Sequence, residues 1–144
     1  MSRRTSILKA LAERLKVLDG SSYISNLQNN SYAKLKFWDE VNDFPSVYMS
    51  PGTEFRDYQL GGFAWAILGI SIKAYCRGDD AQEQLEQLLD DIETVIDSNT
   101  KLVYNTNTNY ETTEILISSV TTDEGLLIPY AVGEINLQVR YQVM

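Results

Sequence analysis

Apolar residues recur at helical spacing in two segments of the chain. Residues 5–19 carry one such stripe, with Thr5 or Ser6 as the expected N-cap and Gly20 as the residue after the helix. Residues 80–97 carry the second, and Asp80 with Glu83 predicts a capping box at its start. Both segments are therefore predicted to be amphipathic helices. The apolar stripes are Ile7, Leu8, Leu11, Leu15 and Leu18, and Ala81, Leu85, Leu88, Leu89, Ile92, Val95 and Ile96.

Alternating patterns elsewhere predict strands. In residues 63–76 every even position is apolar, whereas the odd positions are apolar only at Phe63, Trp65 and Ile67. This predicts one face buried throughout and the other buried over its first half. A straight strand of this length would span about 45 Å, so we expect a bend near Gly69.

The remaining segments are shorter. Strands are predicted at 34–38, 46–50, 101–105, 113–121 and 133–143. Residues 115–117 are apolar on both faces, which predicts a central strand. Residues 20–33 and 51–62 are polar, and we expect a loop and a long hairpin loop there. The order of elements predicts a single α+β domain over residues 1–144, with a mixed or mostly antiparallel β-sheet and both amphipathic helices packed on one face.

Composition narrows the class of protein. The chain of 144 residues has 44% hydrophobic and 22% charged residues, which suits a globular domain with its own core. It has no histidine, the commonest catalytic base and zinc ligand. Cys76 is the one cysteine, so no internal disulfide is expected, and its apolar surroundings in the sequence predict a core position.

The charge and hydrophobicity of the chain argue against several further classes of protein. The net charge of −8 argues against a protein that neutralises nucleic-acid phosphates or binds an anionic membrane surface. No apolar stretch approaches the roughly 20 residues of a membrane span. Arg3 and Arg4 faintly resemble the start of an export signal, but Lys9, Glu13 and Arg14 interrupt the apolar part. We expect a helix there and a protein made in a cytoplasm.

Catalytic motifs are missing from the sequence. We find no phosphate-binding loop, metal-ligand spacing or nucleophile motif. A glycosidase-type site needs two carboxylates that face each other across a cleft, whereas Asp90 and Asp91 would point about 100° apart on a helix. We therefore expect solvated carboxylates, no catalysis and no cofactor or metal. The adjacent carboxylates are Asp79/Asp80, Asp90/Asp91 and Asp123/Glu124.

Two features suggest a role beyond folding. The apolar triplet Leu126, Leu127 and Ile128 lies in a predicted connection between strands, where exposed apolar residues often mark subunit contacts. The alternative is that this connection folds back on its own core. The last strand has a polar face, which by itself favours plain exposure to water, with a channel lining as the alternative. The polar positions are Glu134, Asn136, Gln138 and Arg140.

These residues carry a resemblance. Residues 121–130 (TTDEGLLIPY) and 133–141 (GEINLQVRY) resemble the C-terminal part of the tail terminators of T5-like siphophages, and residues 83–97 (EQLEQLLDDIETVID) resemble their second helix. The similarity is weaker at residues 5–7, at 19–20 and around Phe44 and Pro45, and it is loose over 20–62.

The resemblance implies a ring of six subunits at the head-proximal end of the tail tube. Such a ring stops tube polymerisation, contacts the tail tube protein and a head-completion or connector protein, and passes DNA only as non-specific cargo. The polar face of the last strand would then line the lumen, and net negative charge would suit a conduit that does not bind DNA. The candidate ring contacts are Leu126, Leu127, Ile128, Tyr130, Asp123 and Glu124. The candidate axial contact loop contains Glu54, Phe55, Arg56, Asp57 and Tyr58.

Other functions stay open at this point. A tail tube subunit or a head–tail joining protein of the same fold would share every pattern described above. A small binding module predicts a monomer with a formed pocket. A hydrolase predicts a catalytic role for Asp123 or Glu124.

Overall fold

Two long antiparallel strands form the centre of the molecule. The computed structural model describes residues 2–108 and 110–143. Strand β3 (Ala64–Arg77) pairs with β7 (Tyr130–Val143) along its whole length, from Ala64 opposite Val143 to Arg77 opposite Tyr130. They lie inside a five-stranded sheet of order β1-β2-β3-β7-β6, in which only β1 (Ser31–Tyr32) runs parallel to its neighbour.

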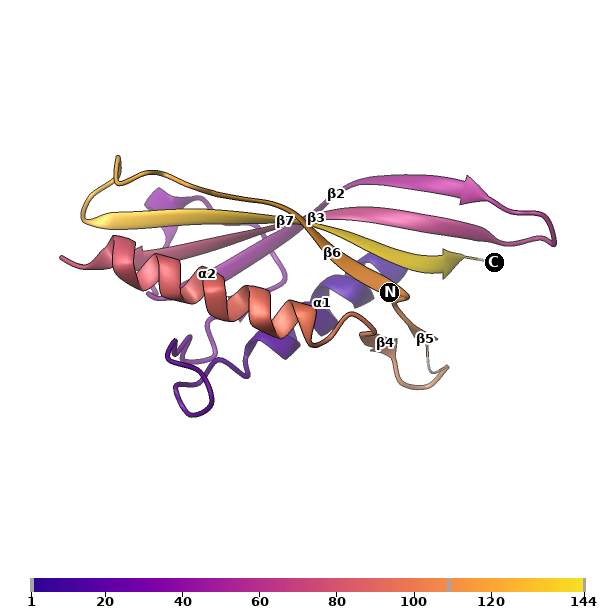
Figure 1. The fold of residues 1–144 in the computed structure, drawn as a ribbon, viewed down its shortest axis with the longest axis horizontal. Helices are drawn as coiled ribbons and strands as arrows, with labels where there is room; N and C mark the ends of the chain where they lie inside the picture. Colours follow the sequence, from indigo (N-terminus) through magenta and orange to yellow (C-terminus); the bar gives the residue numbers. More distant parts are fainter. Residues whose placement is uncertain (1, 109, 144) are drawn as a thin grey trace.

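Both helices cover one face of this sheet (Figure 1). Helix α1 (Arg3–Leu15) and helix α2 (Ala81–Asp97) bury their predicted apolar stripes against the even positions of β3 and the odd positions of β7. The predicted α+β class and the helices on one face are confirmed. The core also contains Cys76, as predicted, and burial raises the pKa of its thiol to about 12.

The helix ends differ from the sequence predictions. Helix α1 begins at Arg3, earlier than predicted, because the hydroxyl of Ser2 accepts the backbone N–H of Thr5 at 3.1 Å and caps the helix there. The helix ends at Leu15. The predicted capping box of α2 is wrong. Asp80 is the N-cap residue, but its carboxylate makes no capping bond and accepts a hydrogen bond from the side chain of Gln84 instead.

Strand β2 (Ser46–Tyr58) corrects the prediction of a loop at 51–62. It pairs with β3 as far as Tyr58 opposite Ala64, so residues 54–58 are strand and the connection spans only residues 59–63. These polar residues form a strand because β3 supplies a long pairing partner and an exposed ribbon tolerates polar side chains on both faces. The resulting hairpin extends beyond the helices (Figure 1).

The expected irregularity at Gly69 lies in the neighbouring strands. Strand β2 shifts register between Pro51 and Glu54, which pair with Ile70 and Leu68 on either side of Gly69. Strand β6 (Glu114–Thr122) shifts register between Ile117 and Ser119, at the same level of the sheet. Two bulges at one level increase the local twist, so the sheet bends here.

Strand β6 corrects a second prediction, because it forms an edge of the sheet and not its centre. Ile115 is buried, but Leu116 faces away from the helices and is 52% exposed.

The predicted strand at 34–38 is also wrong. Residues 34–37 form no helix or strand, and a short 3₁₀ helix, η1 (Trp38–Glu40), follows them. Elsewhere, β4 (Val103–Asn105) pairs with β5 (Tyr110–Glu111) in a small separate sheet.

The outer face of the sheet is the face away from the helices. The sequence predicted that the first half of β3 would be buried on this face, but the structure covers the second half. Residues 37–45 cross the second half of β3, and Val41 of this segment is buried against Tyr48 and Tyr75. The first half, with Phe63, Trp65 and Ile67, is only half-buried. The sequence could not show this, because residues 37–45 come from a loop distant in sequence. No helix in the described residues is long and apolar enough to cross a membrane.

Candidate assembly surfaces

The loop between β6 and β7 exposes part of the apolar triplet. Leu126 is 84% exposed and Ile128 is 81% exposed, whereas Leu127 is half-buried. The alternative that the whole loop folds back on the core therefore does not hold for Leu126 and Ile128. Two large apolar side chains on one short loop are typical of a surface that contacts another protein.

Asp123 holds this loop in a defined shape. One carboxylate oxygen accepts the backbone N–H of Leu127 at 3.1 Å, and the other accepts that of Val132 at 3.2 Å. Glu124 adopts the left-handed region with φ of 57°, and the hydroxyl of Thr122 accepts its backbone N–H at 3.2 Å. The loop thus presents its apolar residues without a large ordering cost. Both oxygens of the Asp123 carboxylate accept hydrogen bonds from the backbone around the loop, so this carboxylate has a structural role.

Tyr130, the remaining candidate in this region, is half covered by its own chain. Its ring lies 5.6 Å from that of Trp38 and 5.7 Å from that of Phe44, and the Arg77 guanidinium lies 5.3 Å above it. Trp38 and Phe44 belong to the segment that crosses the outer face. Tyr130 therefore links this segment to the start of β7.

The β2–β3 hairpin exposes a second apolar surface at the opposite end of the strands (Figure 1). Phe55 and Tyr58 are exposed, and Leu60 at the tip is 99% exposed. Sequence reasoning named Phe55 and Tyr58 but missed Leu60, although a leucine beside Gly61 and Gly62 in a predicted connection was a usable signal.

Glu54 is not part of that exposed surface. The Tyr141 hydroxyl donates a hydrogen bond to it, and Arg56 forms an ion pair with it at 2.7 Å. Burial alone would raise the pKa of Glu54, but the hydrogen bonds from Tyr141 and Arg56 outweigh it and lower the pKa. Burial and this bond raise the pKa of Tyr141. Glu54 therefore fastens β2 to β7 through Tyr141, and Arg56 pairs with Glu54 within β2.

The four candidate lumen residues lie in a row on the outer face. Glu134 accepts a hydrogen bond from Ser71 at 2.7 Å and forms an ion pair with Lys73 at 3.5 Å. Asn136 donates to the hydroxyl of Ser119 at 2.9 Å. These polar groups bond to their cross-strand neighbours, so the face carries few free charges.

Arg140 belongs to the same row and contacts an aromatic ring within the sheet. Its guanidinium lies 4.6 Å from the centroid of the Trp65 ring, a cation–π contact. Glu114 is its cross-strand neighbour on β6. One face of the guanidinium is therefore covered by an aromatic ring, which lowers its availability to phosphates.

The carboxylate of Asp43 holds residues 37–45 against the outer face of the sheet. Asp43 accepts hydrogen bonds from the hydroxyls of Tyr32 at 2.8 Å and Tyr48 at 2.9 Å, and the Tyr75 hydroxyl donates to the backbone oxygen of Lys36 at 2.6 Å. Burial would raise the pKa of Asp43, but these two hydrogen bonds lower it. Sequence reasoning did not find this cluster, since its members lie on separate elements.

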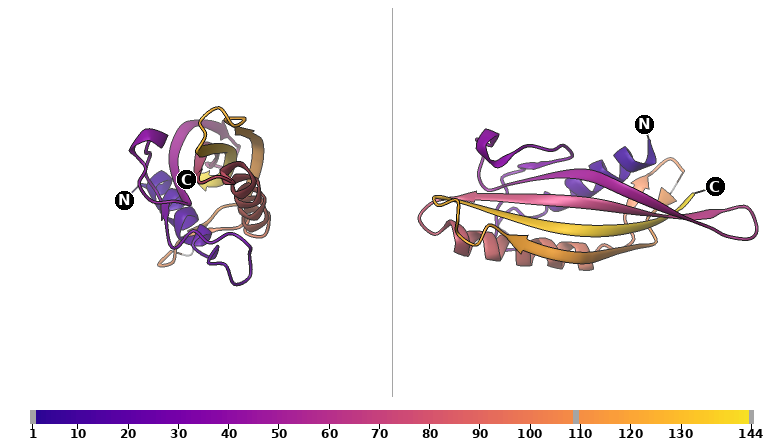
Figure 2. Two further views of the ribbon diagram at one scale, coloured as in Figure 1. Left: turned by 90° about the vertical axis from the view of Figure 1, so that its left-hand side faces the viewer. Right: turned by 90° about the horizontal axis from the view of Figure 1, so that it is seen from above.

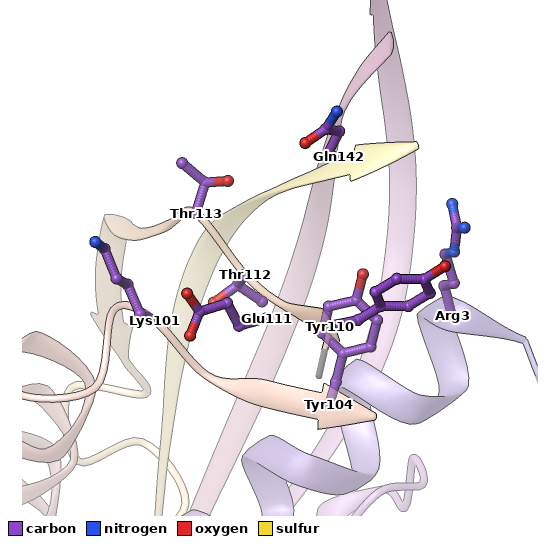
Figure 3. A pocket seen from close by; sticks show the side chains of 8 residues that line it. All are labelled: Arg3, Lys101, Tyr104, Tyr110, Glu111, Thr112, Thr113 and Gln142. Atoms are coloured by element: carbon purple, nitrogen blue, oxygen red, sulfur yellow. The ribbon is translucent and has the colours of Figure 1, made fainter. Parts of the chain in front are cut away.

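A hollow of about 420 Å³ lies between α1 and the β4–β5 sheet (Figure 3). Tyr104 and Tyr110 lie on one side with Arg3, whose guanidinium is 5.3 Å from the Tyr110 ring, and Lys101 and Glu111 lie on the other. Its lining contains one carboxylate, that of Glu111, and no cysteine or histidine. The full lining is Arg3, Lys101, Tyr104, Tyr110, Glu111, Thr112, Thr113 and Gln142.

Comparison with known proteins decides the family. The family model described as Bacteriophage Tail Tube Terminator Protein matches residues 1–144. This chain belongs to the phage tail tube terminator family. A terminator relative, the tail tube terminator protein p142 of Escherichia phage T5, is 41% identical over 153 residues, which cover 99% of this chain and 95% of p142.

The terminator fold extends to a distant structure. A chain from the virion of a native gene transfer agent particle matches with a TM-score of 0.62 at 11% identity, and the match covers 99% of this chain and 100% of that one. At that identity the likeness shows the fold alone. The terminator family is a family of structural virion proteins of the phage tail and not an enzyme family. The protein therefore associates with other tail proteins.

Proposed function

We propose that this terminator forms a hexameric ring that closes the head-proximal end of the tail tube and stops its polymerisation. The observation that carries this proposal is the pair of exposed apolar surfaces at opposite ends of one subunit, with Leu126 and Ile128 at one end and Tyr58 and Leu60 at the other. Because the two surfaces differ and point apart, a subunit can use both at once for different partners.

Contacts between unlike surfaces favour a ring. A head-to-tail interface closes when its rotation divides a full turn, whereas a two-fold interface stops at a dimer. In this proposal the loop with Leu126, Leu127 and Ile128 contacts a neighbouring subunit, together with Tyr130 and the exposed Glu124. The hairpin with Phe55, Asp57 and Tyr58 contacts the tail tube protein or the head-completion protein along the axis.

The outer face of the sheet is proposed to line the lumen, with Glu134, Asn136, Gln138 and Arg140 toward the DNA. Support comes from the contacts of Glu134, Asn136 and Arg140 with neighbouring strands, in which Lys73 is ion-paired and Arg140 lies over Trp65, so few cations are left for phosphates. In this proposed orientation the excess negative charge of the subunit does not face the lumen. The excess acidic residues lie at 79–97, on and just before α2, which covers the other face of the sheet.

The test is the assembly state of the purified protein. Native mass spectrometry of the protein alone, and electron microscopy after adding tail tubes that lack a terminator, measure ring formation and capping. We expect six-fold rings, or a cap on one end of each tube.

Each other outcome overturns the proposal in a different way. Long tubes grown from this protein alone would make it a tube subunit. A monomer that leaves tube ends free would favour a small binding module. Capping at the end distal to the head, seen on tubes with a marked tip, would reverse the proposed position in the virion.

A further inference from the structure

The charged residues of this chain are strongly separated along the sequence. Residues 79–97 contain eight acidic and no basic residues, and the rest of the chain contains twelve of each, so this one segment accounts for the net charge of −8. Residues 3–36 contain seven basic and two acidic residues. A subunit with one basic and one acidic segment has a strong electrostatic polarity.

The fold places the two segments on opposite sides of the subunit. Helix α1 packs against β1 and β2 near one edge of the sheet, and α2 packs against β3, β7 and β6 toward the other edge. Figure 2 shows this separation in the end-on view, with α1 and residues 33–45 on one side and α2 on the other. The two sides face the neighbours that a side-by-side ring would provide.

The first side, here called the lysine side, consists of Lys9, Lys16, Lys34, Leu35 and Phe37. The Ser31 hydroxyl donates to the backbone oxygen of Ala12 at 2.7 Å, so this face of α1 meets β1. Lys9 lies three residues before Ala12 and Lys16 four residues after it, which places both on the same helical face. Lys34 follows β1, and Leu35 and Phe37 beside it are exposed.

The second side, here called the acidic side, consists of Glu86, Asp90, Glu93 and Val120. Asp91 accepts hydrogen bonds from Ser25 at 3.0 Å and from Gln87 at 3.1 Å, and so marks the flank of α2 that faces the loop on the α1 side. At about 100° per residue, Glu86 and Glu93 lie on the opposite flank, with Asp90 at the crest.

The acidic side includes an exposed apolar residue. Val120 of the edge strand β6 is exposed and pairs with Ile135 of the core face, so it lies on the face of the sheet that α2 covers. Burial and the neighbouring Asp90, Asp97 and Glu86 raise the pKa of Glu93, so these carboxylates repel one another in the isolated subunit. A facing row of cations would relieve that repulsion.

We propose that the lysine side of one subunit packs against the acidic side of the next, a contact that repeats around the ring. This inference rests on the proposed ring and adds which surfaces meet. Glu13 pairs with Lys16 at 2.7 Å, but Lys9 and Lys34 leave an excess of positive charge on the lysine side, and the acidic side carries only negative charge. Each side also exposes apolar residues, so two copies are complementary when unlike sides meet. A contact between identical sides would place like charges together.

Two charge-reversal variants test the contact. The lysine-side variant carries Lys9→Glu and Lys34→Glu, and the acidic-side variant carries Glu86→Lys and Glu93→Lys. We expect each alone to lose rings and tube capping, and an equimolar mixture to recover them. Because recovered subunits must alternate, native mass spectrometry should find equal numbers of the two variants, which a ring of six allows and an odd-numbered ring forbids.

The controls separate this inference from the proposed function. Arg14→Glu with Lys101→Glu changes the net charge as much as the lysine-side variant does. Arg14 lies eleven residues after Arg3, which contacts Tyr110 of β5, so it is on the flank of α1 toward the β4–β5 sheet, and Lys101 lies just before β4. This control should assemble like wild type. Reversal variants that form rings normally, or a mixture without recovery, overturn the inference while the ring stands. Wild-type protein that forms no ring alone or on tube ends overturns the proposed function.

Discussion

Gly133 of β7 lies directly against Leu89 of α2, with the position of a Cβ on Gly133 only 3.1 Å from both δ-carbons of Leu89. Leu85 approaches equally closely. A residue without a side chain therefore lets α2 approach the centre of the sheet. We predict that Gly133→Ala destabilises the protein by about 1–3 kcal/mol, the usual cost of overpacking a core, as measured by urea denaturation.

A double-mutant cycle checks the cause of that loss. Leu89→Ala alone should cost about 2–5 kcal/mol because it opens a cavity. In the presence of Leu89→Ala the added methyl of Gly133→Ala has room, so the double variant should lose less than the sum of the two single losses. Additive losses would show that the methyl does not meet Leu89.

Asp91 anchors the long loop after α1. Its side chain is 6% exposed, and it accepts the backbone N–H of Ser25 at 3.0 Å. Asp91→Ala should cost about 1–3 kcal/mol because that N–H loses its partner. Hydrogen exchange should accelerate over residues 20–30. The control Asp90→Ala, at an exposed position of the same helix, should stay within about 0.5 kcal/mol of wild type.

Periodicity predicted the elements that bury a full stripe or a full face. Both helices, β3 and β7 lie close to their predicted segments, because their apolar positions repeat at a period that only one kind of element satisfies. The failures have a common cause. Residues 54–58 and Leu116 belong to strands whose environment depends on pairing and cover from distant segments, which a local pattern does not encode.

The candidate sites that lie within one segment of the sequence could be predicted, whereas those that join several elements could not. The exposed Leu126 and Ile128 were visible as apolar residues in a predicted loop, and the row containing Glu134 was visible as alternation in a single strand. The cluster of Asp43 with Tyr32 and Tyr48 was not visible, because it joins three elements. Asp91 was predicted to be solvated and is buried, since its partner Ser25 lies 66 residues away.

Acid should weaken the hydrogen bonds that the carboxylates of Asp43 and Glu54 accept. Hydrogen bonds lower the pKa of Asp43 below its ordinary 3.8 and that of Glu54 below 4.5 despite partial burial. A depressed folded-state pKa adds stability above the unfolded value, and this stability is lost as pH falls through the folded value. Unfolding free energy should therefore decrease below about pH 4.5.

The variant Asp43→Asn with Glu54→Gln isolates this effect. It should be less stable than wild type at pH 7 and should show a flatter dependence on pH below 4.5, because neither replacement titrates. Thermal unfolding followed by circular dichroism at a series of pH values measures both. Parallel curves for the two proteins would assign the acid sensitivity to other carboxylates.

Leu126→Asp with Ile128→Asp tests the exposed loop between β6 and β7. Both side chains are more than 80% exposed, so the variant should fold with a melting temperature close to wild type and yet fail to form rings. Leu127→Asp is the matched control for folding. Leu127 is half-buried, so its replacement should lower the melting temperature because it places a carboxylate against apolar surface. If the Leu126 and Ile128 variant assembles and caps tubes normally, the loop makes no essential subunit contact.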